Sequence, residues 1–537
     1  MSAYENIGVM LDMSRNGVMK VSEVKRFIDY LSKMGYNALE LYTEDTFVLE
    51  GEPFFGYLRG GYTAEEIKEI DLYALDKGVE LIPCIQTLAH FTNTRKIPRF
   101  QELFDIDDIL MIGEEKTYEF LEKIFQTLAK NFTSRKVNIG MDEADNVGLG
   151  KYLREHDYKN RSELLVQHLN RVSEIAEKYG FTCHMWSDMF FRLISGGGYF
   201  AEDLKDIHVS PEIAAKVPNN VALTYWTYYT TEKEKYDMMF DKHLEFGREV
   251  WFAGGTVSWQ GFAPLNGYSL RTLRPAMESV REKGVKNVLI CVWGDNGKEC
   301  SYFSILPSLF ATRQFADGVY DMDVIKVKFK ELFAIDFDQF MALDLPNEFY
   351  IDGVKNIEWN CLCATMTYND CFLGIKDADY AKFDKIDYQG YAKTLAEYAK
   401  TAGEFSYLFE TLSCLCSYLE YKAEIGLKTR KFYKEKDFPK LKGMVEYYHE
   451  TVRRLDNFTK ALKKQWMKEC KPFGWEIQEI RLGGMRARLL GSAERLALYL
   501  NGELEKIEEL EVEILHYGDR NGFMYHRYLE AISPSEL

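Results

Sequence analysis

The sequence has no long apolar run. Among its 537 residues no stretch of about 18 uninterrupted apolar residues occurs, so nothing in it predicts a membrane-spanning helix. The start, MSAYENIGVMLDMSR, lacks the charged segment and the apolar segment of a secretory signal peptide. These two absences predict a cytoplasmic protein that does not work in a membrane.

The chain also has too few basic residues to suit a polyanionic partner. It carries 67 lysines and arginines against 84 aspartates and glutamates, a formal net charge of −17 at pH 7. Such a charge repels the phosphates of nucleic acids and of anionic membranes. We therefore expect neither nucleic acid nor membrane as the main partner.

The ten cysteines form no familiar metal-binding pattern. They are scattered through apolar runs such as IPCIQT and LICVWG, where a reduced thiol behaves as a small hydrophobic group. Two CLC triplets, ending at Cys363 and Cys416, are more closely spaced than the C-x2-4-C pairs of zinc sites, and no histidine lies near them. We interpret them as core residues and expect no metal site.

What the chain does have is a repeating pattern over residues 7–315. Short apolar runs alternate with amphipathic segments, and five of those segments end in glycine, which can take the left-handed conformation that closes a helix. One helix is expected to begin with a capping box formed by Thr63 and Glu66. The apolar runs predict eight strands, at residues 7–14, 38–44, 80–87, 137–143, 182–189, 221–228, 250–259 and 287–294.

Eight strands that alternate with helices predict a parallel sheet closed into an α/β fold, the (β/α)8 TIM barrel. An open, doubly wound sheet is the alternative. We place this barrel, as the catalytic domain, at residues 1–320.

A different pattern follows the barrel. Strand-like runs disappear, and the apolar spacing predicts an α-helical C-terminal domain over residues 321–537. Its apolar stripes either pack against each other and the barrel or form the surface of a homodimer. The long helical stretches are expected at residues 386–426, 440–469 and 475–510.

In a barrel of this kind, functional side chains gather at the C-terminal ends of the strands. Here those ends carry acids, an arginine, a histidine and aromatic rings, a combination typical of a carbohydrate pocket. Taken singly, each residue has a structural alternative, such as an ion pair for the arginine or a barrel lid for a tryptophan. The candidates are Arg15, Glu44, Asp45, His90, Asp142, Glu143, Trp186, Trp226, Tyr228, Trp259, Trp293 and Asp295.

Asp142 and Glu143 are adjacent in the run IGMDEADNVG. Glycosidases use two carboxylates, whereas neighbouring side chains of a flat strand point to opposite faces. Many barrel glycosidases carry the second acid at the end of strand seven, and the run 250–259 offers none there. The pair is therefore inert, or it works with a nucleophile supplied by something else. If it works, the chain must leave the flat strand conformation around Met141 to Glu143.

The strand-end set resembles glycoside hydrolase family 20, the β-N-acetylhexosaminidases, in which the substrate's own 2-acetamido group is the nucleophile. It is similar in particular to the subgroup without the N-terminal accessory domain and with a helical C-terminal domain. The resemblance implies an exo-acting, retaining enzyme that removes terminal β-linked GlcNAc or GalNAc from glycans and needs no metal or cofactor. In such an enzyme Glu143 is the general acid and base, and Asp142 orients the acetamide.

The resemblance also implies binding roles on the hydroxyl side of the sugar. Arg15, in DMSR, matches the arginine that binds the O3 and O4 hydroxyls. Glu44 or Asp45, in TED, lies near the acid of the second strand, where the family usually has two aspartates. His90, in QTLAH, matches a pocket histidine that supports the acid through neighbouring groups.

Aromatic residues complete the resemblance. Trp186 in MWSD and Trp226 in TYW match indoles that wall the acetamido pocket. In WGD, Trp293 lies beneath the sugar ring and Asp295 contacts O4 and O6, where the family more often has Trp-Gly-Glu.

Strand seven departs from the family, which commonly has Tyr-x-Asp where this chain has SWQGF. Tyr228, two residues after Trp226, is the expected replacement for the tyrosine that binds the acetamido carbonyl, and Trp259 is an extra indole. Two other functions remain open at this point. One is a related exo-glycosidase for sugars without the acetamide, such as β-galactosides, and the other is a non-catalytic glycan-binding protein.

Overall fold

The computed structural model of the chain describes residues 4–516, 528 and 532–535. The chain divides into two compact units. The ends of the predicted domains 1–320 and 321–537 lie outside the described residues, and the boundary between those domains stays a prediction. The first unit comprises Met1–Thr256, Ser269–Trp293 and Leu309–Asp321, and the second comprises Val257–Tyr268, Gly294–Ser308 and Met322–Leu537.

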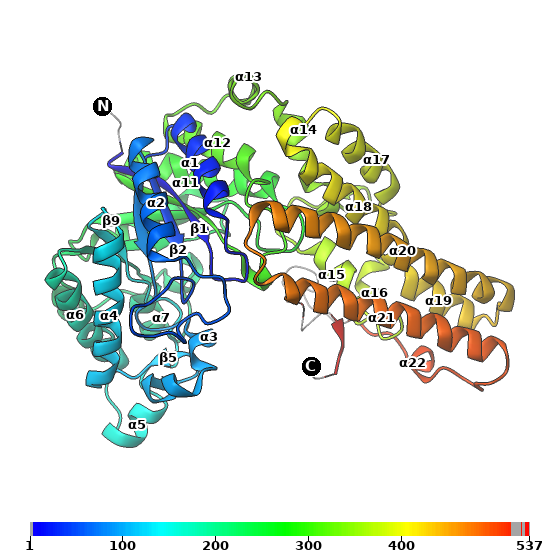
Figure 1. Ribbon diagram of the computed structural model, residues 1–537, viewed down its shortest axis with the longest axis horizontal. Coiled ribbons are helices and arrows are strands. Elements are labelled where there is room, and N and C mark those ends of the chain that lie inside the picture. Colours follow the sequence, from blue (N-terminus) through cyan, green and yellow to red (C-terminus); the bar gives the residue numbers. More distant parts are fainter. Residues whose placement is uncertain (1–3, 517–527, 529–531, 536–537) are drawn as a thin grey trace. The chain divides into compact units, whose positions relative to one another are not determined.

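The first unit contains a closed barrel of eight parallel strands (Figure 1). Strand β1 pairs with β2 on one side and with β10 on the other, so the sheet closes on itself. The predicted (β/α)8 barrel is therefore confirmed, and the open doubly wound sheet is wrong. In barrel order the strands are β1 (Asn6–Asp12), β10 (Asn287–Val292), β9 (Val250–Gly255), β8 (Val221–Trp226), β7 (Thr182–Trp186), β6 (Lys136–Asn138), β3 (Glu80–Cys84) and β2 (Ala38–Tyr42).

Helices with one apolar face cover this barrel. In α1 (Val21–Met34) the apolar positions Val24, Phe27 and Ile28 are buried. The five glycines expected to close helices have φ between 61° and 87°, and the predicted capping box opens α2 (Ala64–Asp76). The other helices before residue 321 are α3 (Thr92–Arg95), α4 (Glu115–Asn131), α5 (Lys151–His156), α6 (Arg161–Lys178), α7 (Asp188–Ser195), α8 (Ala201–Leu204), α9 (Pro211–Lys216), α10 (Lys233–Leu244), α11 (Asn266–Lys283) and α12 (Leu306–Ala316).

Each predicted strand runs past its observed C-terminal end. The largest difference is at the fourth strand, which the apolar run extends to Glu143 although β6 ends at Asn138. Some residues beyond these ends, such as Met13, Ile85 and Met141, are still apolar in sequence, but they lie outside the strands, on the rim that carries the functional side chains. A short hairpin of β4 (Phe104–Ile106) and β5 (Ile109–Leu110) was also missed, because its strands are too short to show a periodic pattern.

Three polar side chains meet inside the barrel. His184 Nε2 lies 2.9 Å from Glu40 Oε1, and Asn138 Nδ2 donates to Glu40 Oε2 over 3.2 Å. The His184 ring stacks on Trp251, with the ring centroids 4.2 Å apart. Since the side chains of His184 and Glu40 are 2% and 0% exposed, water cannot replace either partner.

We expect Glu40→Ala to lower the free energy of unfolding of the barrel by about 3–5 kcal/mol, the usual result of breaking a buried pair from one side. Urea denaturation followed by tryptophan fluorescence measures it. Glu102→Ala is the matched control, because Glu102 forms a solvent-exposed pair with Lys116 that should contribute about 0–1 kcal/mol. Equal effects of the two substitutions would contradict the prediction.

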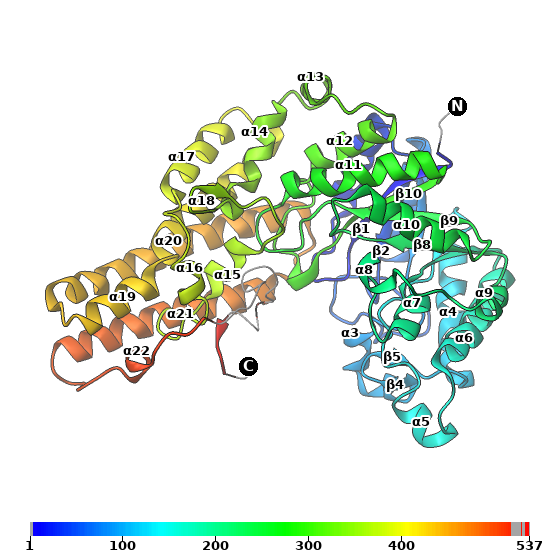
Figure 2. The ribbon, with the colours of Figure 1, turned by 180° about the vertical axis from the view of Figure 1, so that it is seen from behind.

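The second unit is mainly helical (Figure 2). The helix expected at 440–469 is α20 (Phe438–Glu469), and α21 (Trp475–Leu500) packs beside it but ends ten residues before the predicted 510. The stretch 386–426 is not one element, since turns divide it into α17 (Tyr388–Ala399), α18 (Ser406–Lys422) and the start of α19 (Ile425–Lys434). The remaining α-helices are α13 (Met322–Phe333), α14 (Phe337–Met341), α15 (Leu362–Tyr368), α16 (Asp377–Tyr380) and α22 (Glu508–Glu511). One unpredicted hairpin is formed by β11 (Tyr350–Ile351) and β12 (Val354–Lys355).

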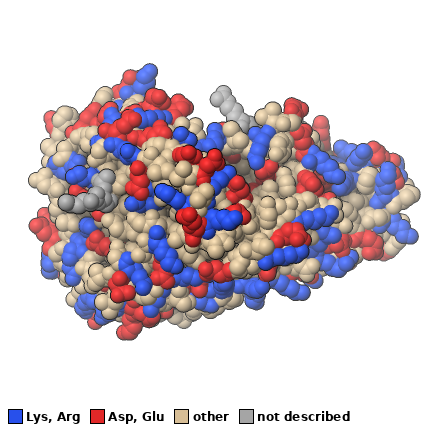
Figure 3. Space-filling view, turned by 90° about the horizontal axis from the view of Figure 1, so that it is seen from above, with Lys and Arg blue, Asp and Glu red and all other residues tan. Residues whose placement is uncertain are grey.

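The surface carries charges of both signs. Figure 3 shows acidic and basic side chains interspersed over the face that it presents. The net charge of −17 is therefore not gathered into one patch on that face. Within the described residues, no helix combines the length and the hydropathy that crossing a bilayer requires.

Candidate active site

The strand that leads to the acid pair ends early. After Asn138 the backbone φ is positive at Gly140 (70°), Met141 (74°) and Glu143 (52°). Left-handed backbone at non-glycine residues is strained and gathers at functional sites. The expectation that the chain leaves the flat strand conformation here is therefore confirmed. As a result the two acids have different surroundings, with 12% of the Asp142 side chain and 47% of the Glu143 side chain exposed.

Asp142 is held by two side chains. Gln86 Nε2 donates to Asp142 Oδ1 over 2.8 Å, and His90 Nε2 lies 3.1 Å from Asp142 Oδ2. Burial alone would lower the pKa of His90, but the Asp142 carboxylate outweighs burial and raises this pKa to about 10. Burial also opposes ionisation of Asp142, yet the His90 cation and the hydrogen bond from Gln86 hold the pKa of Asp142 below its usual value. At neutral pH the two groups therefore form an ion pair.

A chain of hydrogen bonds continues from Asp142 along the rim. Gln86 Nε2 donates to the Tyr42 hydroxyl, and that hydroxyl donates to Glu44 Oε1, each over 3.0 Å. Glu44 Oε1 in turn lies 3.4 Å from Arg15 Nη2. The Arg15 guanidinium also lies 4.9 Å from the centre of the Tyr42 ring. The structure thus brings Arg15 and Glu44 together with the acid pair.

The two acids of the TED motif have different partners. Glu44 faces Arg15, whereas Asp45 Oδ1 accepts a hydrogen bond from Arg59 Nε over 2.9 Å. Arg59 also donates to the carbonyl oxygen of Ser14, which ties the loop after β2 to the loop after β1. Glu44 is therefore the acid beside the arginine expected to bind sugar, and Asp45 lies against Arg59.

Glu143 has three polar neighbours. Its backbone N–H donates to Asp188 Oδ2 over 3.1 Å, and its Oε1 lies 3.4 Å from Arg192 Nη2. His90 Nε2 is 3.9 Å from Glu143 Oε2 and thus faces both acids. Asp188 and Arg192 are one turn apart in α7, so that a single helix holds both the backbone and the carboxylate of Glu143.

Four predicted aromatic residues form one cluster. The ring centroids of Trp186 and Trp293 are 6.1 Å apart, and those of Trp226 and Tyr228 are 5.5 Å apart in a stacked arrangement. Trp293 Nε1 donates to the Tyr228 hydroxyl over 2.9 Å, which joins the two pairs. The Arg15 guanidinium lies 5.2 Å from the centre of the Trp293 ring. Aromatic surface therefore adjoins the polar chain described above.

Two predicted residues stand apart from this description. Trp259 and Asp295 belong to the second unit, where Asp295 begins a short 3-10 turn, Asp295–Gly297. Their place in a sugar site stays a prediction from the sequence.

Two groups of side chains among the described residues have the spacing that a metal ion would require. In each, three donor atoms lie within 4.8 Å of one another: His90, Asp142 and Glu143 in one, and Glu114, Glu155 and His156 in the other. In the first group His90 already neutralises Asp142 as an ion pair, which accounts for the close approach without an ion. The expectation that no metal is needed stays a prediction and is tested below.

Several residues of this site were missed in the sequence analysis. Gln86 and Tyr42 connect Asp142 to Glu44, and Arg192 faces Glu143. Asp188, which accepts from the Glu143 N–H, lies at the same predicted strand end as Trp186 but was given no role. Asp188 offered a signal, since it follows the predicted strand-end Trp186 by two residues, and Arg192 lies at helical spacing from Asp188. Gln86 and Tyr42 offered none, because each lies in or beside an apolar strand.

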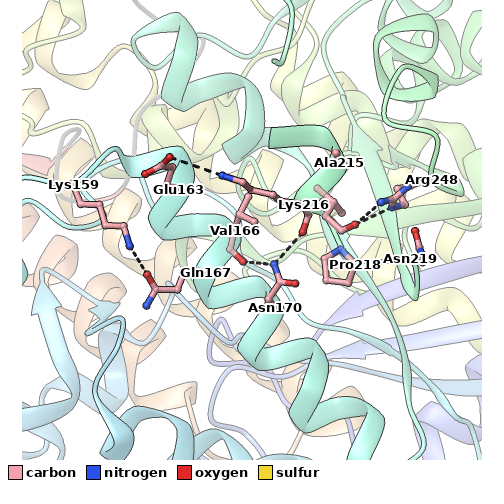
Figure 4. Close-up of a pocket in the computed structure, with 11 residues that line it drawn as sticks. Lys159, Glu163, Val166, Gln167, Asn170, Ala215, Lys216, Pro218, Asn219 and Arg248 are labelled. Carbon is pink, nitrogen blue, oxygen red and sulfur yellow. Dashed lines mark hydrogen bonds and ion pairs between the residues drawn. The ribbon is translucent and has the colours of Figure 1, made fainter. Parts of the chain in front are cut away.

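A separate hollow of about 690 Å³ lies beside α6 (Figure 4). Its charged side chains are satisfied by the protein itself: Lys159 donates to Gln167, Lys216 faces Glu163, and Arg248 donates to a backbone carbonyl. None of the predicted site residues lines it. We therefore assign the chemistry to the strand-end rim and not to this hollow.

The left-handed turn makes Gly140 a sensitive position. A Cβ there would lie 2.1 Å from Gln86 Oε1 and 2.8 Å from the carbonyl oxygen of Ile85, in a backbone of φ +70°. We expect Gly140→Ala to lower the free energy of unfolding by about 2–5 kcal/mol, combining left-handed strain with overpacking. Gly247→Ala is the matched control, because its φ is +61° and nothing lies within 4 Å of the added Cβ, so only the strain of about 1–2 kcal/mol applies. Equal losses in a thermal or urea denaturation would show that the contact with Gln86 is unimportant.

This geometry defines a class of protein, a closed (β/α)8 barrel whose rim carries an acid pair, an imidazole and an aromatic wall. Residues 4–239 match the sequence profile described as "Glycosyl hydrolase family 20, catalytic domain". Residues 338–528 match the profile described as "Glycoside Hydrolase 20C C-terminal domain". The chain belongs to glycoside hydrolase family 20.

Characterised relatives are distant. Hexosaminidase D of Homo sapiens is 24% identical over 347 residues, which cover 59% of this chain and 66% of the relative. Beta-hexosaminidase of Vibrio furnissii is 28% identical over 215 residues, 31% of this chain and 34% of the relative. The chain thus spans less than two thirds of the length of these two relatives. Among solved structures, an exo β-N-acetylglucosaminidase of the same family from Vibrio harveyi is 17% identical, with 63% of this chain and 58% of that chain covered at a TM-score of 0.47.

Proposed function

We propose that this chain is a β-N-acetylhexosaminidase that removes terminal β-linked GlcNAc or GalNAc from glycans by an exo-acting, retaining mechanism. One observation carries the proposal. The left-handed turn gives two adjacent acids separate environments, with Asp142 buried as an ion pair and Glu143 accessible. The family and the names of its relatives, hexosaminidase D and beta-hexosaminidase, support this substrate class.

In the proposed mechanism the substrate's acetamide is the nucleophile. Glu143 donates a proton to the glycosidic oxygen while the acetamide carbonyl oxygen attacks the anomeric carbon, which yields an oxazolinium ion. Glu143, now a carboxylate, takes a proton from the water that opens this ion. Asp142 faces the acetamide N–H and offsets the positive charge that develops on nitrogen. Because His90 keeps Asp142 ionised, the stabilising charge is in place before the reaction.

The remaining residues would bind the sugar. Arg15, positioned by Glu44, would hold the O3 and O4 hydroxyls, and Trp293 would pack under the ring. Trp186 and Trp226 would wall the acetamide. Tyr228, whose hydroxyl accepts a hydrogen bond from Trp293 Nε1, is the proposed partner of the acetamide carbonyl. Asp45, Trp259 and Asp295 complete the proposed set.

A panel of aryl β-glycosides tests the proposal. Hydrolysis of the β-N-acetylglucosaminide or β-N-acetylgalactosaminide, together with inhibition by a thiazoline that mimics the oxazoline, is the expected result. Faster hydrolysis of a β-galactoside without thiazoline inhibition would instead support an exo-glycosidase for sugars without the acetamide. Binding of glycan without any hydrolysis would support a glycan-binding protein.

Removal of divalent metals is expected to leave this activity within about twofold of its starting value, because neither the proton transfers nor the acetamide attack uses a Lewis acid. Dialysis against EDTA, with assay before and after, measures the change. A loss that zinc or another divalent ion restores would assign a metal to the His90, Asp142 and Glu143 group.

We also propose a cytoplasmic enzyme whose partner is a glycan and not a nucleic acid. Support comes from the free, buried thiols of the barrel strands, such as Cys84, Cys183 and Cys291, which suit a reducing compartment. The homodimer through the helical domain stays a prediction, and light scattering coupled to size exclusion would measure it.

A further inference from the structure

Asp188 is a buried carboxylate with an unusual set of contacts. Its side chain is 0% exposed, and its Oδ2 accepts two hydrogen bonds, from Glu143 N–H over 3.1 Å and from Arg192 Nε over 2.8 Å. Its Oδ1 is buried without a hydrogen-bond partner. Burying a carboxylate costs free energy unless its contacts compensate. Here two hydrogen bonds compensate, and both connect Asp188 with Glu143. One comes from the Glu143 N–H itself, and the other comes from Arg192, which also faces the Glu143 carboxylate.

Arg192 is held on several sides. Besides the bond to Asp188, Nη1 donates to the carbonyl oxygen of Gly197 over 3.3 Å and lies 3.7 Å from Asp145 Oδ2. The remaining nitrogen, Nη2, lies 3.4 Å from Glu143 Oε1. The guanidinium is also 6.0 Å from the centre of the Trp226 ring. An arginine fixed in this way presents one N–H to Glu143 in a set direction.

Glu143 needs such support for two reasons. Its backbone is left-handed, with φ 52°, a conformation that persists only where the surroundings impose it. Its side chain is 47% exposed, so packing alone does not fix the carboxylate. Asp188 supports the left-handed backbone by accepting a hydrogen bond from the Glu143 N–H, and Arg192 fixes the carboxylate by lying beside Oε1.

We propose that Asp188 and Arg192 are positioning residues that hold the turn at Glu143 and stabilise its carboxylate after proton transfer. The inference rests on the proposed function, since it assigns Glu143 as the general acid and base. Arg192 favours the charged form of Glu143 that exists after it has protonated the leaving group. Asp188 does not touch the substrate; it fixes Arg192 and the Glu143 backbone.

The charges around Asp188 agree with this assignment. Burial raises the pKa of Asp188 to about 7, the charge of Asp142 adds to the rise, and Arg192 opposes it. Glu143, and the Tyr199 hydroxyl from the segment after α7, are the other titratable groups that face Asp188. Because the pKa of Asp188 is raised, its carboxylate form, which binds Arg192 best, is lost as the pH falls below about 7.

The test compares Arg192→Gln, Arg192→Lys and Asp188→Asn with wild type, using aryl β-N-acetylglucosaminides with a poor and a good leaving group. We expect Arg192→Gln to lower kcat/KM for the poor leaving group by about 10- to 100-fold, part of the contribution of general acid catalysis. We also expect the loss to be smaller, within about threefold, for the good leaving group, because its departure needs little protonation. Affinity for the thiazoline should stay within about threefold of wild type, since Arg192 is not among the residues proposed to hold the acetamide.

The other variants separate positioning from folding. Arg192→Lys keeps the charge and should restore part of kcat/KM for the poor leaving group, which a purely structural role would not predict. Asp188→Asn should lower kcat more than it raises KM. Arg171→Gln, at an exposed arginine of α6 that pairs with Glu115, is the matched control and should behave as wild type.

Two results would overturn the inference. One is an Arg192→Gln enzyme with the wild-type rate on the poor leaving group, and the other is a loss of thiazoline affinity as large as the loss of rate, which would indicate a collapsed site. Should Arg192→Gln not fold, Arg192→Met, which also removes the charge, is used for the same comparison; the same loss is expected for the poor leaving group, and the wild-type rate would again overturn the inference. A wild-type chain that does not hydrolyse the substrates, or that ignores the thiazoline, would instead refute the proposed function itself.

Discussion

Glu143→Gln is expected to lower kcat on substrates with poor leaving groups by about 10²- to 10⁴-fold, because the amide cannot protonate the glycosidic oxygen. This loss corresponds to about 3–5 kcal/mol of transition-state stabilisation. On a 2,4-dinitrophenyl glycoside, which departs without protonation, the first step should be nearly unaffected. The dependence of the loss on the leaving group is what identifies the proton donor, and steady-state rates over a series of substituted phenyl glycosides measure it.

The control for this experiment is Glu155→Gln, which makes the same chemical change at an exposed position of α5. It should keep wild-type rates on every substrate. Equal losses of Glu143→Gln on good and poor leaving groups would contradict the assignment of the proton donor. Full activity of Glu143→Gln on poor leaving groups would refute the role of the acid pair.

Asp142→Asn is expected to lower kcat by about 10²- to 10³-fold, the usual effect of removing one preorganised electrostatic contact from a developing charge. Unlike the loss in Glu143→Gln, this loss should be similar for good and poor leaving groups, because every substrate must form the oxazolinium ion. Thiazoline inhibition should weaken in parallel, since the analogue carries the same ring. Substrate hydrolysis and inhibition constants, both measured on the folded variant, test the two expectations.

The pH dependence separates this role from a structural one. The pKa of His90 is raised to about 10 and that of Asp142 is lowered, so the pair stays ionised across the neutral range. The contribution of the ion pair to kcat should be present at neutral pH. It should fall at low pH, where Asp142 becomes protonated, and also at high pH, where His90 loses its proton near pH 10. In Asp142→Asn the alkaline change should disappear, because the substitution removes the carboxylate that raises the pKa of His90. An unaltered alkaline limb in the variant would show that His90 does not depend on Asp142.

The elements of the barrel could be predicted from the sequence, because each depends on a local pattern. Glycines that close helices and the capping box at Thr63 act within a few residues, and the structure confirms them. The end of the fourth strand could not be located, since Ile139 and Met141 continue in sequence the alternation that begins at Val137. Positive φ values after Asn138 mark the change from strand to rim, and the segment after β3 contacts this turn through the hydrogen bond from Met141 N–H to Gln86 Oε1.

The same limit applies to the candidate site. Strand-end logic placed Arg15, Glu44 and His90 near the acid pair, because a parallel barrel brings all eight C-terminal ends to one rim. It could not choose between Glu44 and Asp45, because the difference depends on their partners, Arg15 for Glu44 and Arg59 for Asp45. Nor could it find the polar contact of Glu40 with His184, since both belong to runs that otherwise indicate apolar strands.

The pairing of each acid with a cation affects the choice of inhibitors. His90 lies beside Asp142 and Arg192 beside Glu143, so with both carboxylates ionised these four groups carry no net formal charge. A permanently cationic sugar mimic would meet acids that are already compensated, and it would gain little Coulomb energy over a neutral one. Ligand selectivity should then follow the shape of the ring and the hydrogen bonds of the acetamide, and dissociation constants should change little with ionic strength.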